Sequence, residues 1–333
     1  MPKLTDSHKR RIDYLRLAVT DRCNLRCVYC MPSEGIKTKP HDEILSFEEM
    51  VFFAKVAVEQ GISRIRLTGG EPLVRKGIVS LVETLSSIRG LEDLSLTTNG
   101  VLLSKYAKSL KRAGVRRLNI SLDSVDPEIY EKITRGGRLD RVIEGIEACI
   151  AAGFNPVKLN VVMLKDVNEK IKPFINLIHK YPVHIRFIEF MPVGKDVSVE
   201  NLVPAEKIKG KLRKFGKLEE VPFLDGAGPA RYFRFPKAQG TFGFIPAMSQ
   251  CFCEECNRLR LTADGFLRTC LFSEEELNVR EAIRRGEKED GMRRLIKQAL
   301  DAKPKDYEAV QKKYIKKSKA KAKSKRDMFQ IGG

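Results

Sequence analysis

The sequence is poor in the residues and patterns that many common functions require. It has four histidines, none of them in a motif, which argues against a catalytic triad or histidine-based acid/base chemistry. No apolar run approaches the roughly 20 residues that span a membrane, and the polar segment from Met1 to Arg11 lacks the apolar stretch of a signal peptide. We therefore expect a cytoplasmic protein without a membrane partner, whose cysteines stay reduced.

Acidic residues are also scarce relative to basic ones. The 333-residue chain has 62 Lys and Arg against 43 Asp and Glu, a formal net charge of +19, and its 42% hydrophobic residues are typical of a globular protein. A large positive charge suggests nucleic acid, an acidic membrane surface or a polyphosphate as partner. However, residues 303–326 contain eleven Lys or Arg and two Asp or Glu, a net charge of +9. We interpret this segment as a solvated, extended linker, and a nucleic-acid partner is not expected.

Short aliphatic runs alternate with amphipathic stretches through the first 190 residues. The runs predict strands over 14–19, 64–68, 94–98, 118–122, 157–164 and 184–190, and the stretches predict helices over 46–61, 77–90, 104–114, 139–153 and 169–180. This repetition predicts parallel strands with helices outside them. Polar side chains gather after the strand ends, as on the active face of a barrel, and no G-x-G-x-x-G follows the first strand. Because only six units are present, we expect an incomplete (βα)6 barrel of the TIM type over residues 1–192.

The pattern changes after Pro192 to that of a smaller α+β region over residues 193–302. It predicts a helix over 204–216, strands over 231–235, 242–246, 258–262 and 266–270, and two further helices over 274–286 and 289–301. The remaining residues, 303–333, comprise the Lys-rich linker and a tail that ends in two glycines.

Six of the eight cysteines form two groups of three, and the first group follows the first predicted strand. Cys23, Cys27 and Cys30 have the spacing C-x3-C-x2-C, which lets three thiolates converge on one soft metal centre. A structural zinc site would require a fourth ligand, and no further cysteine or histidine lies close by in the sequence. An iron-sulfur cluster with one open iron is therefore favoured over zinc. Cys149 stands alone in a predicted helix and is expected to be a small buried hydrophobe.

This cysteine motif resembles that of the radical S-adenosylmethionine (SAM) enzymes. In that family the open iron of a [4Fe-4S] cluster chelates SAM, and reduction releases a 5'-deoxyadenosyl radical. A glycine pair before Glu71 lets the backbone approach a ligand closely, although the same sequence is common in simple strand-to-helix turns. The resemblance implies that the residues contacting SAM are Tyr29, Gly70, Glu71, Ser121 and Met191.

The second group, Cys253-x2-Cys256-x13-Cys270, by itself also fits a zinc ribbon with Cys251 as a fourth ligand. The surrounding sequence CNRLRLTADGFLRTC, together with RLTGGEPLVR, FIEFMPVG and the terminal IGG, resembles the molybdenum cofactor biosynthesis protein A family, the GTP 3',8-cyclases. In that family three cysteines hold a second [4Fe-4S] cluster in the C-terminal region. Cys251 replaces an expected proline, and its binding to iron would close the open coordination site.

The resemblance implies an enzyme of the lyase class. It would convert GTP to 3',8-cyclo-7,8-dihydro-GTP, and its substrate contacts would be Arg16, Arg66, Thr97, Lys158, Arg258, Leu259 and Arg260. Gly332 and Gly333 would enter the barrel and take part in the radical step. Implied partners are cyclic pyranopterin monophosphate synthase as the next enzyme and a flavodoxin- or ferredoxin-type reductant, and a homodimer is compatible with it. The alternatives are a radical SAM enzyme acting on a peptide or an RNA base, and a zinc protein that binds nucleic acid.

Overall fold

The computed structural model describes residues 3–32, 34–36, 39–194, 201–222, 230–318 and 326–332. Strands from both halves of the chain form one twelve-stranded sheet in the order β12-β11-β10-β1-β2-β3-β4-β5-β6-β9-β8-β7. The first six strands are parallel neighbours in chain order: β1 (Tyr14–Ala18), β2 (Arg64–Thr68), β3 (Asp93–Thr98), β4 (Arg117–Ser121), β5 (Val157–Met163) and β6 (Val183–Glu189). Each lies within one residue of its predicted bounds at both ends.

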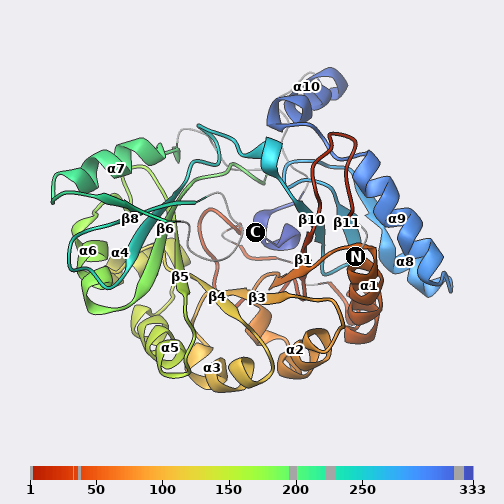
Figure 1. The fold of residues 1–333 in the computed structure, drawn as a ribbon, viewed down its shortest axis with the longest axis horizontal. Helices are drawn as coiled ribbons and strands as arrows, with labels where there is room; N and C mark the ends of the chain where they lie inside the picture. The colour runs from red at the N-terminus through yellow and green to blue at the C-terminus, as the bar shows by residue number, and fades with distance from the viewer. Residues whose placement is uncertain are drawn as a thin grey trace.

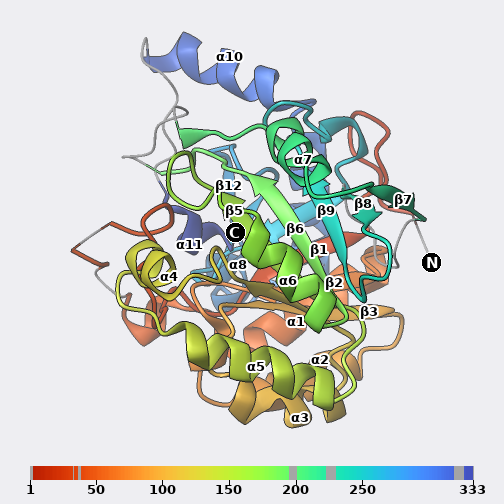
Figure 2. The same cartoon turned by 90° about the vertical axis from the view of Figure 1, so that its left-hand side faces the viewer.

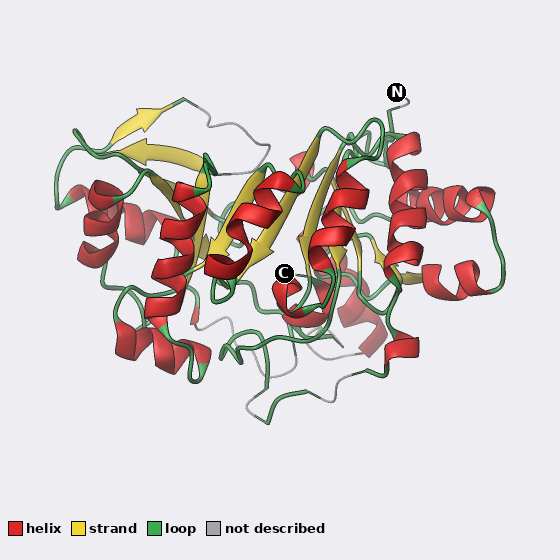
Figure 3. Cartoon of the chain, turned by 90° about the horizontal axis from the view of Figure 1, so that it is seen from below, coloured by secondary structure: helices red, strands yellow, loops and turns green. Residues whose placement is uncertain are grey.

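Helices cover the outer face of these strands (Figures 1 and 3). They are α1 (Phe47–Gln60), α2 (Ile78–Ser86), α3 (Leu103–Arg112), α4 (Pro127–Thr134), α5 (Leu139–Ala151) and α6 (Lys172–Lys180). α1 begins at a capping box between Ser46 and Glu49 and ends at Gly61, whose φ of 119° an L-residue rarely adopts. All were predicted except α4, a two-turn helix that starts at Pro127 behind an Asp126 cap. The buried aliphatic side chains between helices and strands form one large core, in which Cys149 is completely buried as predicted.

The second half of the chain extends the same sheet at both sides. β9 (Thr241–Ile245) pairs in parallel with β6, and β10 (Arg258–Leu261) pairs in parallel with β1. The flanking strands β7 (Glu219–Val221), β8 (Arg231–Arg234), β11 (Phe266–Arg268) and β12 (Glu276–Asn278) are antiparallel. Eight parallel strands thus lie side by side, and their curve is visible in Figure 1.

The later helices match the predictions in part. α7 (Ala205–Arg213) and α9 (Glu289–Asp301) are present, whereas the helix predicted over 274–286 is shortened to α8 (Val279–Arg284) because β12 takes up its first residues. The extended conformation predicted for the Lys-rich segment is wrong for α10 (Tyr307–Ser318), which is helical. Among the described residues, no helix is long and apolar enough to cross a membrane.

A short final helix, α11 (Met328–Ile331), lies inside the molecule near the C-terminal mark in Figure 2. Its first turn is closed by a capping box between Asp327 and Gln330. Ile331 packs with Val193 and Leu271, so residues from three distant parts of the chain meet here. The end of the chain is therefore packed into the interior as far as Gly332.

Candidate active site

The first cysteine group lies on the loop that follows β1. A turn joins two of the cysteines, since the Cys30 amide donates to the Cys27 carbonyl at 2.9 Å. The Cys23 sulfur accepts from the Leu25 amide at 3.4 Å and from the Asn99 side-chain amide at 3.8 Å. Burial raises the pKa of Cys23 to about 11 and that of Cys30 to about 12. Thiols in such an environment ionise only when a cation such as a metal binds them.

The glycine pair at the end of β2 packs against this cysteine loop. The Gly70 amide donates to the Thr20 carbonyl at 2.8 Å. A Cβ on Gly69 would lie 2.3 Å from the Thr20 oxygen, and one on Gly70 would lie 2.2 Å from the Arg22 oxygen. In this structure both glycines are therefore required for the close approach of the two loop backbones, which is a second reason for glycine here besides the predicted approach to SAM.

Glu71 is almost completely buried, and its carboxylate binds groups of the protein. It accepts from the Leu73 amide at 3.0 Å, the Thr98 hydroxyl at 2.8 Å and the Asn99 amide at 2.6 Å. Burial raises the pKa of Glu71 to about 7 despite these three donors. The side chain thus joins the ends of β2 and β3 beside the cysteine loop.

Tyr29, which lies between two of the cysteines, is also hydrogen-bonded to a residue that follows a strand. Its hydroxyl donates to Asp123 at 2.7 Å, and the other Asp123 oxygen accepts from the Val162 amide at 2.8 Å. Burial raises the pKa of Asp123 to about 6. Asp123 follows β4 and was not predicted as a site residue, although the sequence does show a polar pair after that strand.

A cavity of about 200 Å³ lies inside the curve of the sheet. Six cationic side chains line it, and no carboxylate does within the described part of the chain; the cations are Arg16, Arg66, Arg186, Arg258, Arg260 and Lys303. Thr97, Met191 and the three cysteines of the second group also form its wall. Most of the predicted substrate contacts therefore line the same cavity as the second cysteine group.

The strand register explains how the positive charges come together. Arg16 on β1 pairs directly with Arg260 on β10 and with Arg66 on β2, so three guanidinium groups occupy one row across neighbouring strands. Burial, followed by repulsion from Arg260 and Arg66, lowers the pKa of Arg16 well below its usual range. Burial and the adjacent Arg258 lower the pKa of Arg260 to about 10. Like charges placed side by side are unfavourable unless an anion offsets them.

Several buried polar atoms of the cavity wall have no hydrogen-bond partner in the described structure. They include the hydroxyls of Thr97 and Thr269 and the Nε of Arg258. Since buried polar groups are nearly always satisfied, such atoms mark a site for a polar ligand. The wall therefore offers both the charge and the hydrogen bonds that a polyanion requires.

The second cysteine group forms one side of this cavity. A short turn joins two of its members, since the Cys256 amide donates to the Cys253 carbonyl at 3.2 Å. Burial, with a further contribution from Cys251, raises the pKa of Cys253 to about 12. Burial also disfavours the Cys256 thiolate, but the charges of Lys303 and Arg258 outweigh it and lower the pKa of Cys256. Cys251 is exposed and lines the same cavity.

The chain end reaches two of the cavity arginines. The Gly332 carbonyl accepts from Arg260 at 2.8 Å and from the Arg16 Nε at 3.1 Å. Gly332 has a φ of 74°, and a Cβ there would lie 2.4 Å from the Thr68 hydroxyl. The predicted Gly333 lies outside the described residues.

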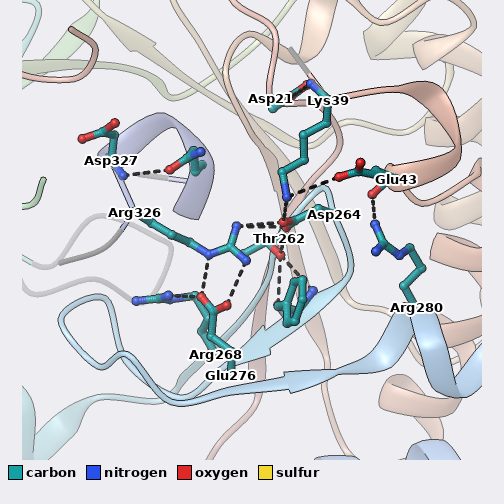
Figure 4. Close-up of polar contacts among 12 residues, drawn as sticks. Asp21, Lys39, Glu43, Thr262, Asp264, Arg268, Glu276, Arg280, Arg326 and Asp327 are labelled. Carbon is teal, nitrogen blue, oxygen red and sulfur yellow. Dashed lines mark hydrogen bonds and ion pairs between the residues drawn. The ribbon is translucent and has the colours of Figure 1, made fainter. Parts of the chain in front are cut away.

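A buried ion-pair network holds the start of this tail (Figure 4). Arg326 binds Asp264 at 2.9 Å and Glu276 at 2.6 Å. Lys39, which follows the first cysteine loop, binds the same Asp264 at 2.6 Å. Arg268 adds a second cation to Glu276. The network connects the tail, the β10–β11 turn and the segment behind the first cysteine group.

Some predicted residues lie apart from the cavity. Lys158 is buried on β5 beside His184, Leu259 points into the hydrophobic core, and Ser121 ends β4. Conversely, Arg186 and Lys303 line the cavity but were not predicted. Arg186 could have been found, because it interrupts a buried strand as Arg16 does, whereas Lys303 is hidden by the Lys-rich sequence that follows it.

No three His, Cys, Asp or Glu side chains within the described ranges form a group that could hold a single metal ion. The three cysteines of a [4Fe-4S] cluster each bind a different iron. Both trios supply the soft thiol donors that such clusters take.

Comparison with known proteins identifies the family. Residues 17–178 match the model of the radical SAM superfamily, and residues 183–309 match that of the molybdenum cofactor synthesis C domain. The crystal structure of Streptococcus suis SuiB bound to S-adenosylmethionine shares the fold, with a TM-score of 0.63 at 15% identity over 82% of this chain and 65% of that one. The fold is thus the α/β fold of radical SAM enzymes.

Curated relatives define the family more narrowly. A GTP 3',8-cyclase of Moorella thermoacetica is 49% identical over 91% of this chain and 95% of its own length. A GTP 3',8-cyclase of Petrotoga mobilis is 45% identical over 99% of this chain and 100% of its own. The chain belongs to the GTP 3',8-cyclase family, the radical SAM enzymes of molybdenum cofactor biosynthesis.

Proposed function

We propose that the cationic cavity binds GTP for conversion to 3',8-cyclo-7,8-dihydro-GTP, between two [4Fe-4S] clusters. The first cluster would be held by Cys23, Cys27 and Cys30, and the second by Cys253, Cys256 and Cys270. The first cluster, with SAM bound, supplies the radical chemistry of the family. The six parallel strands β1 to β6 form the incomplete (βα)6 barrel around this site.

The observation that carries the proposal is the charge of the cavity. A nucleoside triphosphate carries about four negative charges, and guanidinium groups bind phosphate oxygens in pairs. The cavity wall has six cations and no carboxylate among the described residues. The row of Arg260, Arg16 and Arg66 is therefore the phosphate site, where an anion relieves the repulsion between these neighbours.

The other end of the substrate lies toward the second cysteine group. Thr269 is 2% exposed and lines the cavity beside Cys270, and its hydroxyl has no partner among the described residues. It can donate to or accept from a purine edge. An open iron of a three-cysteine cluster would face the same space. If Cys251 bound that iron, this contact would be blocked.

The remaining assignments concern SAM and the chain end. The loop carrying Gly70 and Glu71 borders the first cysteine group, and Tyr29, Ser121 and Met191 complete the SAM contacts. The Glu71 carboxylate accepts hydrogen bonds from three protein donors, so we assign it the role of fixing the conformation of this loop. The Gly332 carbonyl accepts hydrogen bonds from two of the phosphate-site arginines. The family resemblance assigns Gly332 and Gly333 a part in the radical step.

The wider biological assignments follow the family. The enzyme would act in the cytoplasm, receive electrons from a flavodoxin- or ferredoxin-type protein and pass its product to cyclic pyranopterin monophosphate synthase. A homodimer is compatible with these roles.

Anaerobic reconstitution followed by turnover tests this proposal. We expect about eight irons per chain, about four after alanine replaces either cysteine trio, and a cyclised dihydro-GTP from GTP, SAM and a strong reductant. Arg66→Ala should weaken GTP binding at least tenfold, because it removes one cation from the phosphate site. Arg234→Ala is the matched control, because Arg234 is exposed on β8. Zinc without sulfide, or unchanged GTP affinity in Arg66→Ala, would contradict the proposal.

A further inference from the structure

Lys303 is a buried cation beside the second cysteine group. Its side chain lines the cavity although the residue is only 3% exposed. The ammonium donates to the Arg258 carbonyl at 2.8 Å and to the Thr269 carbonyl at 2.7 Å. Arg258 follows Cys256 by two residues, and Thr269 directly precedes Cys270. One side chain therefore fixes the backbone next to two of the three cysteines.

The charge of Lys303 has no carboxylate to offset it. No Asp or Glu lies within 4 Å of its Nζ in the part of the chain that the structure describes. A buried charge without a counter-ion costs several kcal/mol, and backbone carbonyls offset only part of that cost. An ammonium has three donors, and the two carbonyls use two of them. An anionic group on the cavity side would provide the missing compensation.

Arg10 provides a contrast within the same region. Its guanidinium donates to the carbonyls of Cys253, Pro304 and Lys305, each at 2.7 Å. It also binds the Asp6 carboxylate at 2.6 Å. Arg10 therefore holds the backbone of the cysteine loop, and the Asp6 carboxylate neutralises its charge. Lys303 braces the loop as well but adds an uncompensated positive charge.

We propose that Lys303 is a positioning residue of the second cluster, which holds the backbone beside Cys256 and Cys270 and supplies one positive charge to the cluster's surroundings. A thiolate-ligated cluster is an anionic group, and it provides the compensation that no described carboxylate gives. A nearby cation favours the reduced cluster, which carries one more negative charge. This inference rests on the proposed second cluster.

The test measures the reduction potential of the second cluster by a redox titration followed by electron paramagnetic resonance. The full-length chain carries Cys23→Ala, Cys27→Ala and Cys30→Ala, so that only the second group can hold iron. In this background Lys303→Met should lower the potential so far that the oxidised-to-reduced ratio rises about tenfold at the original midpoint, which is 59 mV for one electron. Lys303→Arg keeps the charge and should stay near the original potential.

The Asp6→Asn/Arg10→Met double variant is the matched control, since it removes a brace of the same loop without changing the net charge. We expect it to lose iron more readily while the clusters that remain keep their potential. Loss of the cluster in Lys303→Met but retention in Lys303→Arg would also support the role of the charge. An unchanged potential in Lys303→Met overturns the inference, as does an equal shift in the double variant. Absence of iron in the parent background would instead refute the second cluster itself.

Discussion

Asp264 is the residue on which docking of the C-terminal tail depends. Its carboxylate is 3% exposed and accepts from Arg326, Lys39 and the Thr262 hydroxyl. Asp264→Asn keeps the shape of the side chain but replaces one of the two oxygens by an NH2 group. That group then faces cations that can only donate hydrogen bonds. We predict that the tail detaches from the interior more often in this variant.

The structure sets the size of the effect. Breaking a buried ion pair from one side costs roughly 3–5 kcal/mol. Arg326 retains Glu276, and Lys39 is partly exposed, so we take the lower value of about 3 kcal/mol. At 1.4 kcal/mol for each factor of ten, the ratio of undocked to docked tail rises roughly a hundredfold.

Hydrogen exchange followed by mass spectrometry measures this ratio directly. The amides of α11 exchange when the tail opens, so their exchange should accelerate by up to a hundredfold in Asp264→Asn. Asp301→Asn is the control, because the Asp301–Lys297 pair is exposed and should contribute less than about 1 kcal/mol. Exchange of α11 at the parent rate in Asp264→Asn would refute the reasoning.

Three further predictions concern separate parts of the site. Gly70→Ala should prevent the first cluster from being held, because the new Cβ would lie 2.2 Å from the Arg22 oxygen and displace the cysteine loop. The measurement is iron content, which should fall by about four irons per chain. Arg186→Met should weaken GTP binding at least tenfold in equilibrium dialysis, because it removes a cavity cation, and unchanged affinity would exclude Arg186 from the site. Burial, followed by repulsion from Lys158 and Arg186, lowers the pKa of His184 to about 4, so the folded state favours the neutral ring. The contribution of the neutral ring to stability is then full above about pH 7.5, and stability falls by roughly 1–2 kcal/mol as the pH is lowered to 5, because the unfolded ring binds a proton near its usual pKa and the folded ring does not. A denaturant titration should show this slope flattened in His184→Gln.

The parallel strands were predictable because their sequences are short aliphatic runs that end in turn residues. Strands that are buried on both faces consist mostly of aliphatic residues, so they can be recognised from a short stretch of sequence. The parallel pairing of β9 with β6 and of β10 with β1 was not predictable in the same way. It depends on contacts between segments some 55 to 240 residues apart, and the local sequence of β9 or β10 does not indicate which strand it pairs with.

Likewise, part of the candidate site could be predicted from the sequence and part of it could not. Cys23 could be selected from the sequence because three closely spaced thiols call for a functional explanation. Arg16 could be selected because an arginine in a strand that is buried on both faces calls for one as well. The packing of Gly70 against the Arg22 backbone could not be predicted, because a glycine indicates that some group approaches closely but not which group it is. Lys303 was hidden because composition averages over a segment, and the charge count does not distinguish one buried lysine from the other ten basic residues of 303–326.

The docked tail and the proposed phosphate site share two arginines, so we expect tail docking and GTP binding to be coupled. Arg16 and Arg260 hold the Gly332 carbonyl and also belong to the proposed phosphate site. A guanidinium has five donors in a fixed plane, so one guanidinium can bind the tail carbonyl and a phosphate at the same time. Linkage requires that the factor by which the tail raises GTP affinity equals the factor by which GTP raises tail docking. We therefore expect GTP to slow hydrogen exchange in α11 and Asp264→Asn to weaken GTP binding, and a GTP-independent exchange rate in α11 would show that the two sites act separately.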